Sequence, residues 1–211
     1  VFHEGKNREA LRKTYQIYYD LVNVHELMPK DIMTMDEGAI RQYLYSGEAA
    51  IVAQSSSHMM NIRRERPDLY DVLGTSKYPM PEGYSSVAMF GGWTYAIFTP
   101  DPVKQEAAWK FINMITAPET MGRLNEAHGN LPVRASIYNK SSFFKEDPIY
   151  SQFYDLAFRG ETQARPPVPI YPTISNQLTL VLADVIEGVD IDEAIDEAAD
   201  EVMAEWNRMQ R

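Results

Sequence analysis

The chain has 211 residues, 45% of them apolar, which is the composition of a globular protein and not of a disordered one. It contains no cysteine, which excludes disulfides and thiolate metal sites, and no apolar run approaches the roughly 18 residues of a membrane helix. The formal net charge of −10 argues against nucleic acid as a partner, because phosphate binding requires a basic face.

The first part of the chain is predicted to be mainly helical. Apolar residues recur at helical spacing over 6–26 and 36–46, and Gly47 is suited to end the second helix. Residues 49–54 (AAIVAQ) are predicted to form a short buried strand, because the run is too apolar and too short for a surface helix.

Three serines, Ser55, Ser56 and Ser57, follow this strand and precede a helix expected over about 57–66. This order predicts an N-cap, with free N–H groups and hydroxyls at the carboxyl end of a strand. A weak strand is expected over 71–75, and a loop rich in Pro and Gly over 77–86.

Gly91, Gly92 and Trp93 interrupt the apolar run MFGGWTYAIF. Glycine in a strand costs backbone entropy and packs nothing, so the pair indicates an irregular junction before a strand expected at about 93–98. The neighbouring glycines favour exposure of Trp93, with core packing as the alternative.

The remainder is again predicted to be helical. Helices are expected over 102–116, 118–128 and about 149–159, with 131–148 largely irregular. Four prolines require an extended stretch at 164–172.

Two helices are predicted to close the chain, at about 173–187 and 191–209. Ten acids and no Lys or Arg occur between Asp184 and Glu205. Because apolar residues keep helical spacing there, the acids are interpreted as the solvated face of an amphipathic helix. A partner-binding role for this face stays open. Short strands alternating with dominant helices predict an α/β fold.

Motifs for chemistry are largely missing from the sequence. It contains no HExxH, no GxSxG, no GxGxxG and no GxxxxGK[ST], so no catalytic residue, metal ligand or cofactor is predicted. A pair of glycosidase carboxylates stays open, because such pairs meet in space and not in the chain. The 24 aromatic residues, many of them in loops, favour sugar binding, since aromatic faces stack on sugar C–H patches.

Three segments together resemble a known family. They are YLYSGEAAIVAQSSS (43–57), FGGWTYAIFTPDPVKQEAAWKFINMITAPETMGRLNEAHGNLPVR (90–134) and RPPVPIYPTISNQLTLVLADVIEGVDIDEAIDEAADEV (165–202). In this order and spacing the chain resembles extracellular solute-binding proteins of family 1, the substrate-binding components of carbohydrate ABC importers.

The resemblance implies a periplasmic-binding-protein-like (type II) fold of two α/β lobes, of which this chain is a helix-rich C-terminal portion. By this analogy, residues 1–90 form the first part of the C-terminal lobe. Residues 91–160 belong to the N-terminal lobe, and 161–211 return to the C-terminal lobe with the terminal helices. Much of the N-terminal lobe is then expected to lie outside this sequence.

The resemblance also gives the candidate ligand-binding residues a rationale, since ligands in open α/β sheets lie beyond the carboxyl ends of strands. Each group of candidates has a purely structural alternative. For Ser56 and Ser57 it is N-capping, and for Gly91, Gly92 and Trp93 it is a tight crossover with a buried Trp. For Arg165 it is a surface salt bridge. The candidates are Ser56, Ser57, Gly91, Gly92, Trp93, Arg165 and Tyr171, with Arg134 as a weaker one.

The function expected from the resemblance is capture of a sugar or related polyol in a cleft between lobes and its delivery to permease subunits, without a cofactor and without catalysis. The expected location is periplasmic or extracellular. Membrane contact is expected only through the permease or through an N-terminal lipid anchor absent from this sequence. The alternative is a glycoside-acting enzyme with a carbohydrate cleft.

Overall fold

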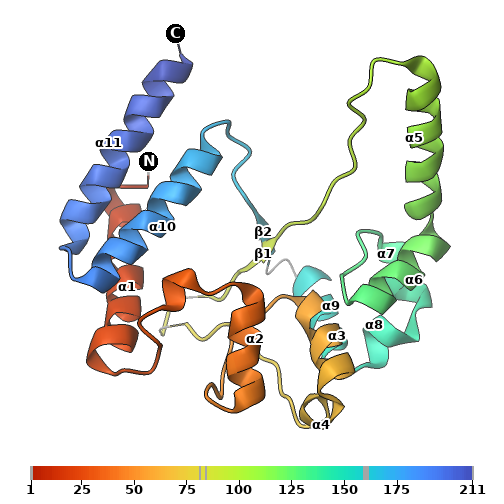
Figure 1. Cartoon of the computed structure of the whole chain (residues 1–211), viewed down its shortest axis with the longest axis horizontal. Helices are drawn as coiled ribbons and strands as arrows, with labels where there is room; N and C mark the ends of the chain where they lie inside the picture. The colour runs from red at the N-terminus through yellow and green to blue at the C-terminus, as the bar shows by residue number, and fades with distance from the viewer. Residues whose placement is uncertain (1, 81, 84, 159–161, 211) are drawn as a thin grey trace. The chain divides into compact units, whose positions relative to one another are not determined.

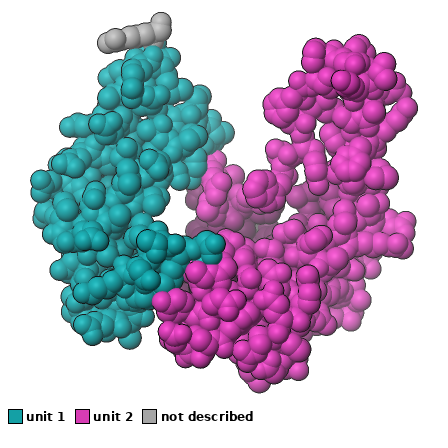
Figure 2. All heavy atoms as spheres, in the orientation of Figure 1, with its two compact units in different colours: residues 1–36, 166–211 teal, residues 37–165 magenta. Residues whose placement is uncertain are grey.

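A computed structural model describes residues 2–80, 82–83, 85–158 and 162–210 of the chain (Figure 1). The chain forms two compact units: unit 1 contains Val1–Asp36 and Pro166–Arg211, and unit 2 contains Glu37–Arg165 (Figure 2). The predicted lobe boundary at 160–161 and the predicted helix end at 159 lie outside the described residues.

Unit 1 brings together helices from both ends of the sequence. Its core combines Tyr15 of α1 with Val181 and Val185 of α10 and with Ile195 and Ala198 of α11, whose bounds are given below. The Tyr15 hydroxyl donates to the Leu178 carbonyl at 2.9 Å, and burial raises the Tyr15 pKa to about 12. The elements are α1 (Gly5–Tyr19), a π-helical turn η1 (Asp20–Val24), a 3₁₀ turn η2 (Ile32–Thr34), α10 (Tyr171–Glu187) and α11 (Ile191–Met209).

Local signals explain the boundaries of α10 and α11. Gly188, at φ 100°, ends α10 in the left-handed region that glycine adopts without strain. The Asp190 carboxylate caps α11 by accepting from the Asp192 and Glu193 N–H groups at 2.9 and 3.2 Å. Both helices confirm the sequence prediction.

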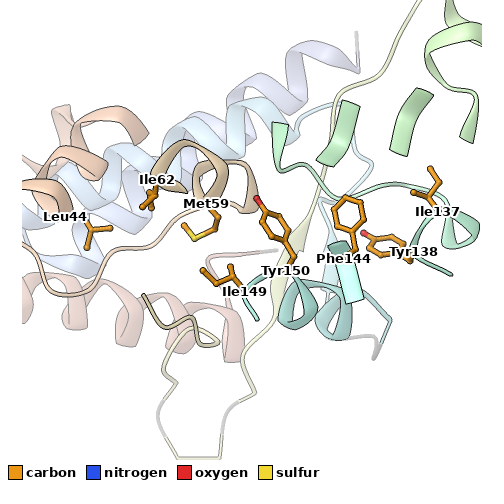
Figure 3. Close-up of a cluster of buried hydrophobic side chains, with 8 residues drawn as sticks. All are labelled: Leu44, Met59, Ile62, Ile137, Tyr138, Phe144, Ile149 and Tyr150. Carbon is orange, nitrogen blue, oxygen red and sulfur yellow. The ribbon is translucent and has the colours of Figure 1, made fainter. Parts of the chain in front are cut away.

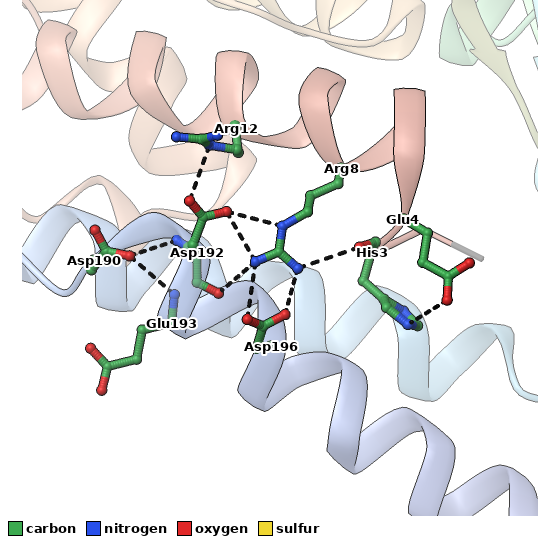
Figure 4. Close-up of polar contacts among 8 residues, drawn as sticks. All are labelled: His3, Glu4, Arg8, Arg12, Asp190, Asp192, Glu193 and Asp196. Atoms are coloured by element: carbon green, nitrogen blue, oxygen red, sulfur yellow. Dashed lines mark hydrogen bonds and ion pairs between the residues drawn. The ribbon is translucent and has the colours of Figure 1, made fainter.

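The acidic face of α11 is partly engaged by α1 (Figure 4). The Arg8 guanidinium donates to Asp192 Oδ1 through Nε at 3.0 Å and to Asp196 Oδ2 through Nη2 at 3.0 Å. The hydrogen bond from Arg8 lowers the pKa of Asp196, and those from the two aspartates raise that of Arg8. Asp196 stays exposed and Asp192 stays half-exposed, so both acids lie on the predicted solvated face and are ion-paired there with Arg8.

Unit 2 contains most of the short helices and the sheet. Its elements are α2 (Glu37–Ser46), α3 (Ser56–Glu65), α4 (Pro67–Tyr70), β1 (Ala88–Phe90), α5 (Pro102–Ile115), α6 (Pro118–His128), α7 (Ala135–Lys140), α8 (Ser142–Glu146), α9 (Tyr150–Phe158) and β2 (Thr162–Ala164).

The unit 2 core joins α2 and α3 to the segment from α7 to α9 (Figure 3). Phe144 and Tyr150 are fully buried and their rings meet edge to face at 6.1 Å, a favourable arrangement for aromatic pairs. The Tyr150 hydroxyl donates to the Ser56 carbonyl at 2.9 Å, which ties α9 to the start of α3. The first turn of α3 is thus held by a buried side chain.

The described sheet consists of β1 and β2, paired in parallel with Ala88 opposite Thr162 and Phe90 opposite Ala164. Residues from 91 onward leave this pair, pass through helices α5 to α9 and come back to it, as Figure 1 shows. A long connection is required, because two parallel strands cannot be joined by a tight turn.

Most helices expected from the sequence are present. Helices α2, α5, α6, α10 and α11 lie within two residues of the predicted bounds, and Gly47 and Gly129 end their helices at positive φ. The expectation of an irregular 131–148 is wrong, because α7 and α8 form there. Their apolar residues Ile137, Tyr138 and Phe144 enter the core and stabilise these short helices.

The strand predictions are wrong. The described residues 49–54, 71–75 and 93–98 form no strand, whereas 88–90 and 162–164 do. Ile51, expected to be buried, is 89% exposed. A strand requires a hydrogen-bonded neighbour, and no described segment pairs with these three.

The predicted division into lobes and the compact units are different partitions of the chain. Unit 2 contains residues from both sides of the predicted boundary at 90–91, and α7 to α9 share a core with α2 and α3. Unit 1 resumes at Pro166, a few residues after the predicted return at 161. The assignment of segments to lobes stays a prediction.

Candidate ligand-binding site

The carboxyl ends of β1 and β2 bring three of the predicted residues near one another. Phe90 and Ala164 are the last paired residues of the two strands. Gly91 and Gly92 follow β1 directly, and Arg165 follows β2 directly. Two candidate regions far apart in sequence therefore lie at the same edge, where open α/β sheets bind ligands.

Gly91 and Gly92 leave their backbone open. A Cβ added at either position would meet nothing within 4 Å, and neither has a positive φ. In the described structure, neither crowding nor an unusual backbone turn therefore requires glycine at these two positions. What the two glycines provide is uncovered backbone that another group can approach closely.

Trp93 is 98% exposed. The alternative of a tight crossover with a buried tryptophan is therefore wrong for the described structure. A fully exposed indole presents a large apolar face with one N–H donor, which is the chemistry that stacks on a sugar ring.

Arg165 contacts the strand opposite to its own. Its Nε donates to the sulfur of Met89 in β1 at 3.0 Å, which holds the guanidinium against the neighbouring strand. The planar fork of a guanidinium suits recognition of paired oxygens.

Ser56 and Ser57 form the first turn of α3, with Ser55 at the N-cap position. The predicted N-cap is confirmed in position, but the Ser55 side chain bonds no backbone N–H. Its hydroxyl instead lies 3.1 Å from that of Ser57. N-capping by the hydroxyl therefore does not account for this serine cluster.

A buried histidine next to these serines was missed by sequence reasoning. Arg41 donates to His58 Nδ1 at 2.7 Å, and because a guanidinium has only donors, His58 Nδ1 is the acceptor. His58 Nε2 is then the donor to Glu37 Oε2, at 2.5 Å. Glu37 and Arg41, four residues apart on α2, thus fix the start of α3. Their helical spacing was the available signal.

Tyr171 begins α10 and belongs to unit 1, whereas the other six candidates belong to unit 2. Within unit 2, the β1–β2 pairing groups Gly91, Gly92 and Arg165. Arg134, the weaker candidate, is the N-cap residue of α7. The role of these residues in ligand binding stays a prediction.

Other kinds of site find little support in the described part of the chain. Its His, Asp and Glu residues form no group of three able to hold a metal ion. Among the described helices, none has the length and apolarity needed to cross a bilayer. Open hollows of about 430 and 480 Å³ occur beside Tyr43 of α2 and between α10 and α11, and no predicted site residue lines either.

The fold is that of a periplasmic binding protein, present in part. The chain is similar to the maltose-bound structure of T. maritima MalE3, with a TM-score of 0.82 and 22% sequence identity, over 96% of this chain and 51% of that chain. This chain therefore spans about half the length of the structure it matches. The likeness confirms the predicted fold class. No protein-family model and no curated protein matches the sequence.

Proposed function

We propose that this chain is part of a solute-binding protein that captures a carbohydrate for an ABC importer and belongs to solute-binding family 1. The observation that carries the proposal is the fold, which matches a maltose-bound protein along 96% of the chain. The exposed indole of Trp93 supports it, since it lies beside the uncovered backbone of Gly91 and Gly92.

In the proposed mechanism, Trp93 stacks on a sugar ring and Arg165 donates to sugar hydroxyls from the neighbouring strand end. Ser56 and Ser57 supply hydroxyls and N–H groups from the first turn of α3. Closure of two lobes then holds the ligand, which is delivered to permease subunits. The proposal includes a periplasmic or extracellular location, binding without catalysis, and no cofactor.

Saturation-transfer NMR with maltose and a panel of other sugars tests the proposal. It detects weak complexes, and weak binding is expected because this chain spans half of the matched structure. Transfer to the protons of at least one sugar is expected. It should be lost in Trp93→Ala and kept in Trp206→Ala, a control at an exposed tryptophan of α11 in unit 1.

Two results would overturn the proposal. Absence of transfer to every sugar of the panel contradicts carbohydrate binding by this chain. Hydrolysis of an oligosaccharide during the same incubation, followed by the appearance of its fragments in the spectrum, favours a glycoside-acting enzyme. Equal transfer in Trp93→Ala and in the unchanged chain would remove Trp93 from the site.

A further inference from the structure

The Arg165 side chain binds a thioether sulfur. Its Nε–H donates to the Met89 sulfur at 3.0 Å. The sulfur of methionine is only a weak acceptor, whereas a guanidinium has five donors and binds carboxylates strongly. No ion pair joins Arg165 to a carboxylate of the described residues. The contact therefore combines a strong donor with a weak acceptor.

The parallel pairing of β1 and β2 accounts for this contact. Met89 lies opposite Gln163, and Arg165 follows Gln163 by two residues. Side chains two residues apart share one face of an extended chain, so Arg165 and Met89 meet on the same face of the pair. The contact is thus a consequence of the strand register.

Met89 is open to reagents in solution. It is 61% exposed, whereas Met59 in the core of unit 2 is 5% exposed. Met114 of α5 is 57% exposed, and no donor to its sulfur is described. Met114 therefore matches Met89 in exposure but lacks the contact with an arginine.

A hydroperoxide oxidises an exposed thioether in one balanced step. A lone pair of the sulfur attacks one peroxide oxygen, so that an S–O bond forms and the O–O bond breaks. The sulfur loses two electrons and the peroxide is reduced. The proton of the transferred oxygen leaves with the other oxygen as water or an alcohol. The product is methionine sulfoxide, which reductases convert back to methionine.

The sulfoxide changes the acceptor that faces Arg165. Its oxygen carries partial negative charge and accepts hydrogen bonds more strongly than a thioether sulfur, and a charged donor strengthens such a bond further. The Arg165 guanidinium already lies at hydrogen-bond distance from the Met89 sulfur. The added oxygen is therefore within its reach without movement of either strand.

We propose that Met89 is a site of reversible oxidation by hydroperoxides, and that its sulfoxide holds the Arg165 guanidinium at the β1–β2 edge. The modification itself requires no ligand. Its consequence rests on the proposed function, in which Arg165 donates to sugar hydroxyls. Oxidation withdraws Arg165 from the sugar and weakens binding, and reduction restores it.

Hydrogen peroxide treatment of the 211-residue chain, followed by peptide mass spectrometry, tests the modification. Met89 is expected to be oxidised at least as fast as Met114, and about tenfold or more faster than the buried Met59. Reductases for the two sulfoxide epimers should remove the added oxygen. Oxidation of Met114 with Met89 left unchanged overturns the proposal.

The hold on Arg165 is measured by NMR of its Nε–H proton. After peroxide treatment, exchange of this proton with water is expected to slow by about fivefold, because a sulfoxide oxygen accepts more strongly than sulfur. Met89→Leu should show no slowing, whereas Met114→Leu, the matched control, should show it. Unchanged exchange in a chain whose Met89 is fully oxidised overturns the proposal.

A sugar that binds in the saturation-transfer experiment tests the consequence for the ligand. Peroxide treatment should weaken transfer in the unchanged chain and in Met114→Leu, but not in Met89→Leu. Equal transfer before and after oxidation of Met89 overturns the withdrawal of Arg165. Absence of binding to every sugar contradicts the proposed function alone, because the mass and exchange measurements contain no sugar.

Discussion

At the scale of single residues, Gly129 is a position where only glycine fits. It ends α6 at φ 75°, and a Cβ there would meet Met60 Cγ at 2.7 Å and the Tyr150 hydroxyl still closer. Tyr150 is fully buried and bonded to Ser56, so its ring cannot give way without loss of that contact. The end of α6 and the start of α3 are therefore constrained by the same side chain.

Gly129→Ala is expected to lower the free energy of unfolding of unit 2 by about 2–4 kcal/mol, the sum of overpacking and left-handed backbone strain. Urea unfolding followed by circular dichroism measures the change. Gly47→Ala is the matched control: Gly47 ends α2 at φ 80° with nothing within 4 Å of an added Cβ. Equal losses in the two variants would show that crowding at Gly129 is unimportant.

At the scale of elements, α9 positions α3 through one hydrogen bond, from Tyr150 to the Ser56 carbonyl. Burial raises the pKa of the Tyr150 hydroxyl, which keeps it protonated as a donor across the neutral range. The predicted ligand residues Ser56 and Ser57 thus depend on a residue almost one hundred positions later in the chain.

Tyr150→Phe removes this donor without changing the shape of the ring. A loss of about 1 kcal/mol in the free energy of unfolding is expected, the usual net contribution of a buried hydrogen bond. Tyr95→Phe, at an exposed tyrosine of the same unit, should change the stability little. The two variants are compared by thermal unfolding, and identical midpoints would contradict a stabilising role for the bond.

The elements also show what sequence reasoning can and cannot reach. Helices such as α6 and α11 were predicted because their apolar spacing and caps are local. The strand β2 was not predicted, because Thr162, Gln163 and Ala164 carry no apolar alternation and pair with residues distant in the chain. Residues 93–98 have a strand pattern but no described partner, so their local sequence alone was misleading.

The same limit applies to the candidate site. The sequence marks Gly91 and Gly92 as an irregular junction and places Arg165 in the extended stretch at 164–172. The parallel pairing that places these residues at one edge arises only in the tertiary structure, because it joins segments far apart in the chain. The contacts of His58 with Glu37 and Arg41 likewise depend on the packing of α2 against α3, which the sequence alone does not show.

At the scale of the whole molecule, unit 1 is discontinuous, and Arg8 joins its two parts. Asp196 has a pKa lowered below its ordinary value of 3.8 by the hydrogen bond from Arg8. Such a carboxylate contributes stability above its unfolded-state pKa and loses it as the pH falls through the folded-state pKa. The contribution is therefore present at neutral pH and disappears in acid below about 3.8.

Asp196→Asn is expected to lower the thermal midpoint of unit 1 at pH 7, and the difference from the unchanged chain should shrink as the pH falls below 3.8. Scanning calorimetry across this range measures it. Asp200→Asn, at another exposed acid of α11, serves as the control. A difference that stays constant down to the most acidic pH would contradict the proposed ion pair.

The placement of the tryptophans has a spectroscopic consequence. Trp93, Trp109 and Trp206 are 98%, 56% and 38% exposed, and both cores are built from other side chains. Indole emission shifts to longer wavelength in water, so the fluorescence of the native chain should already resemble that of an unfolded one. Emission will then report poorly on unfolding of the cores. It will respond instead when a ligand covers Trp93 in unit 2.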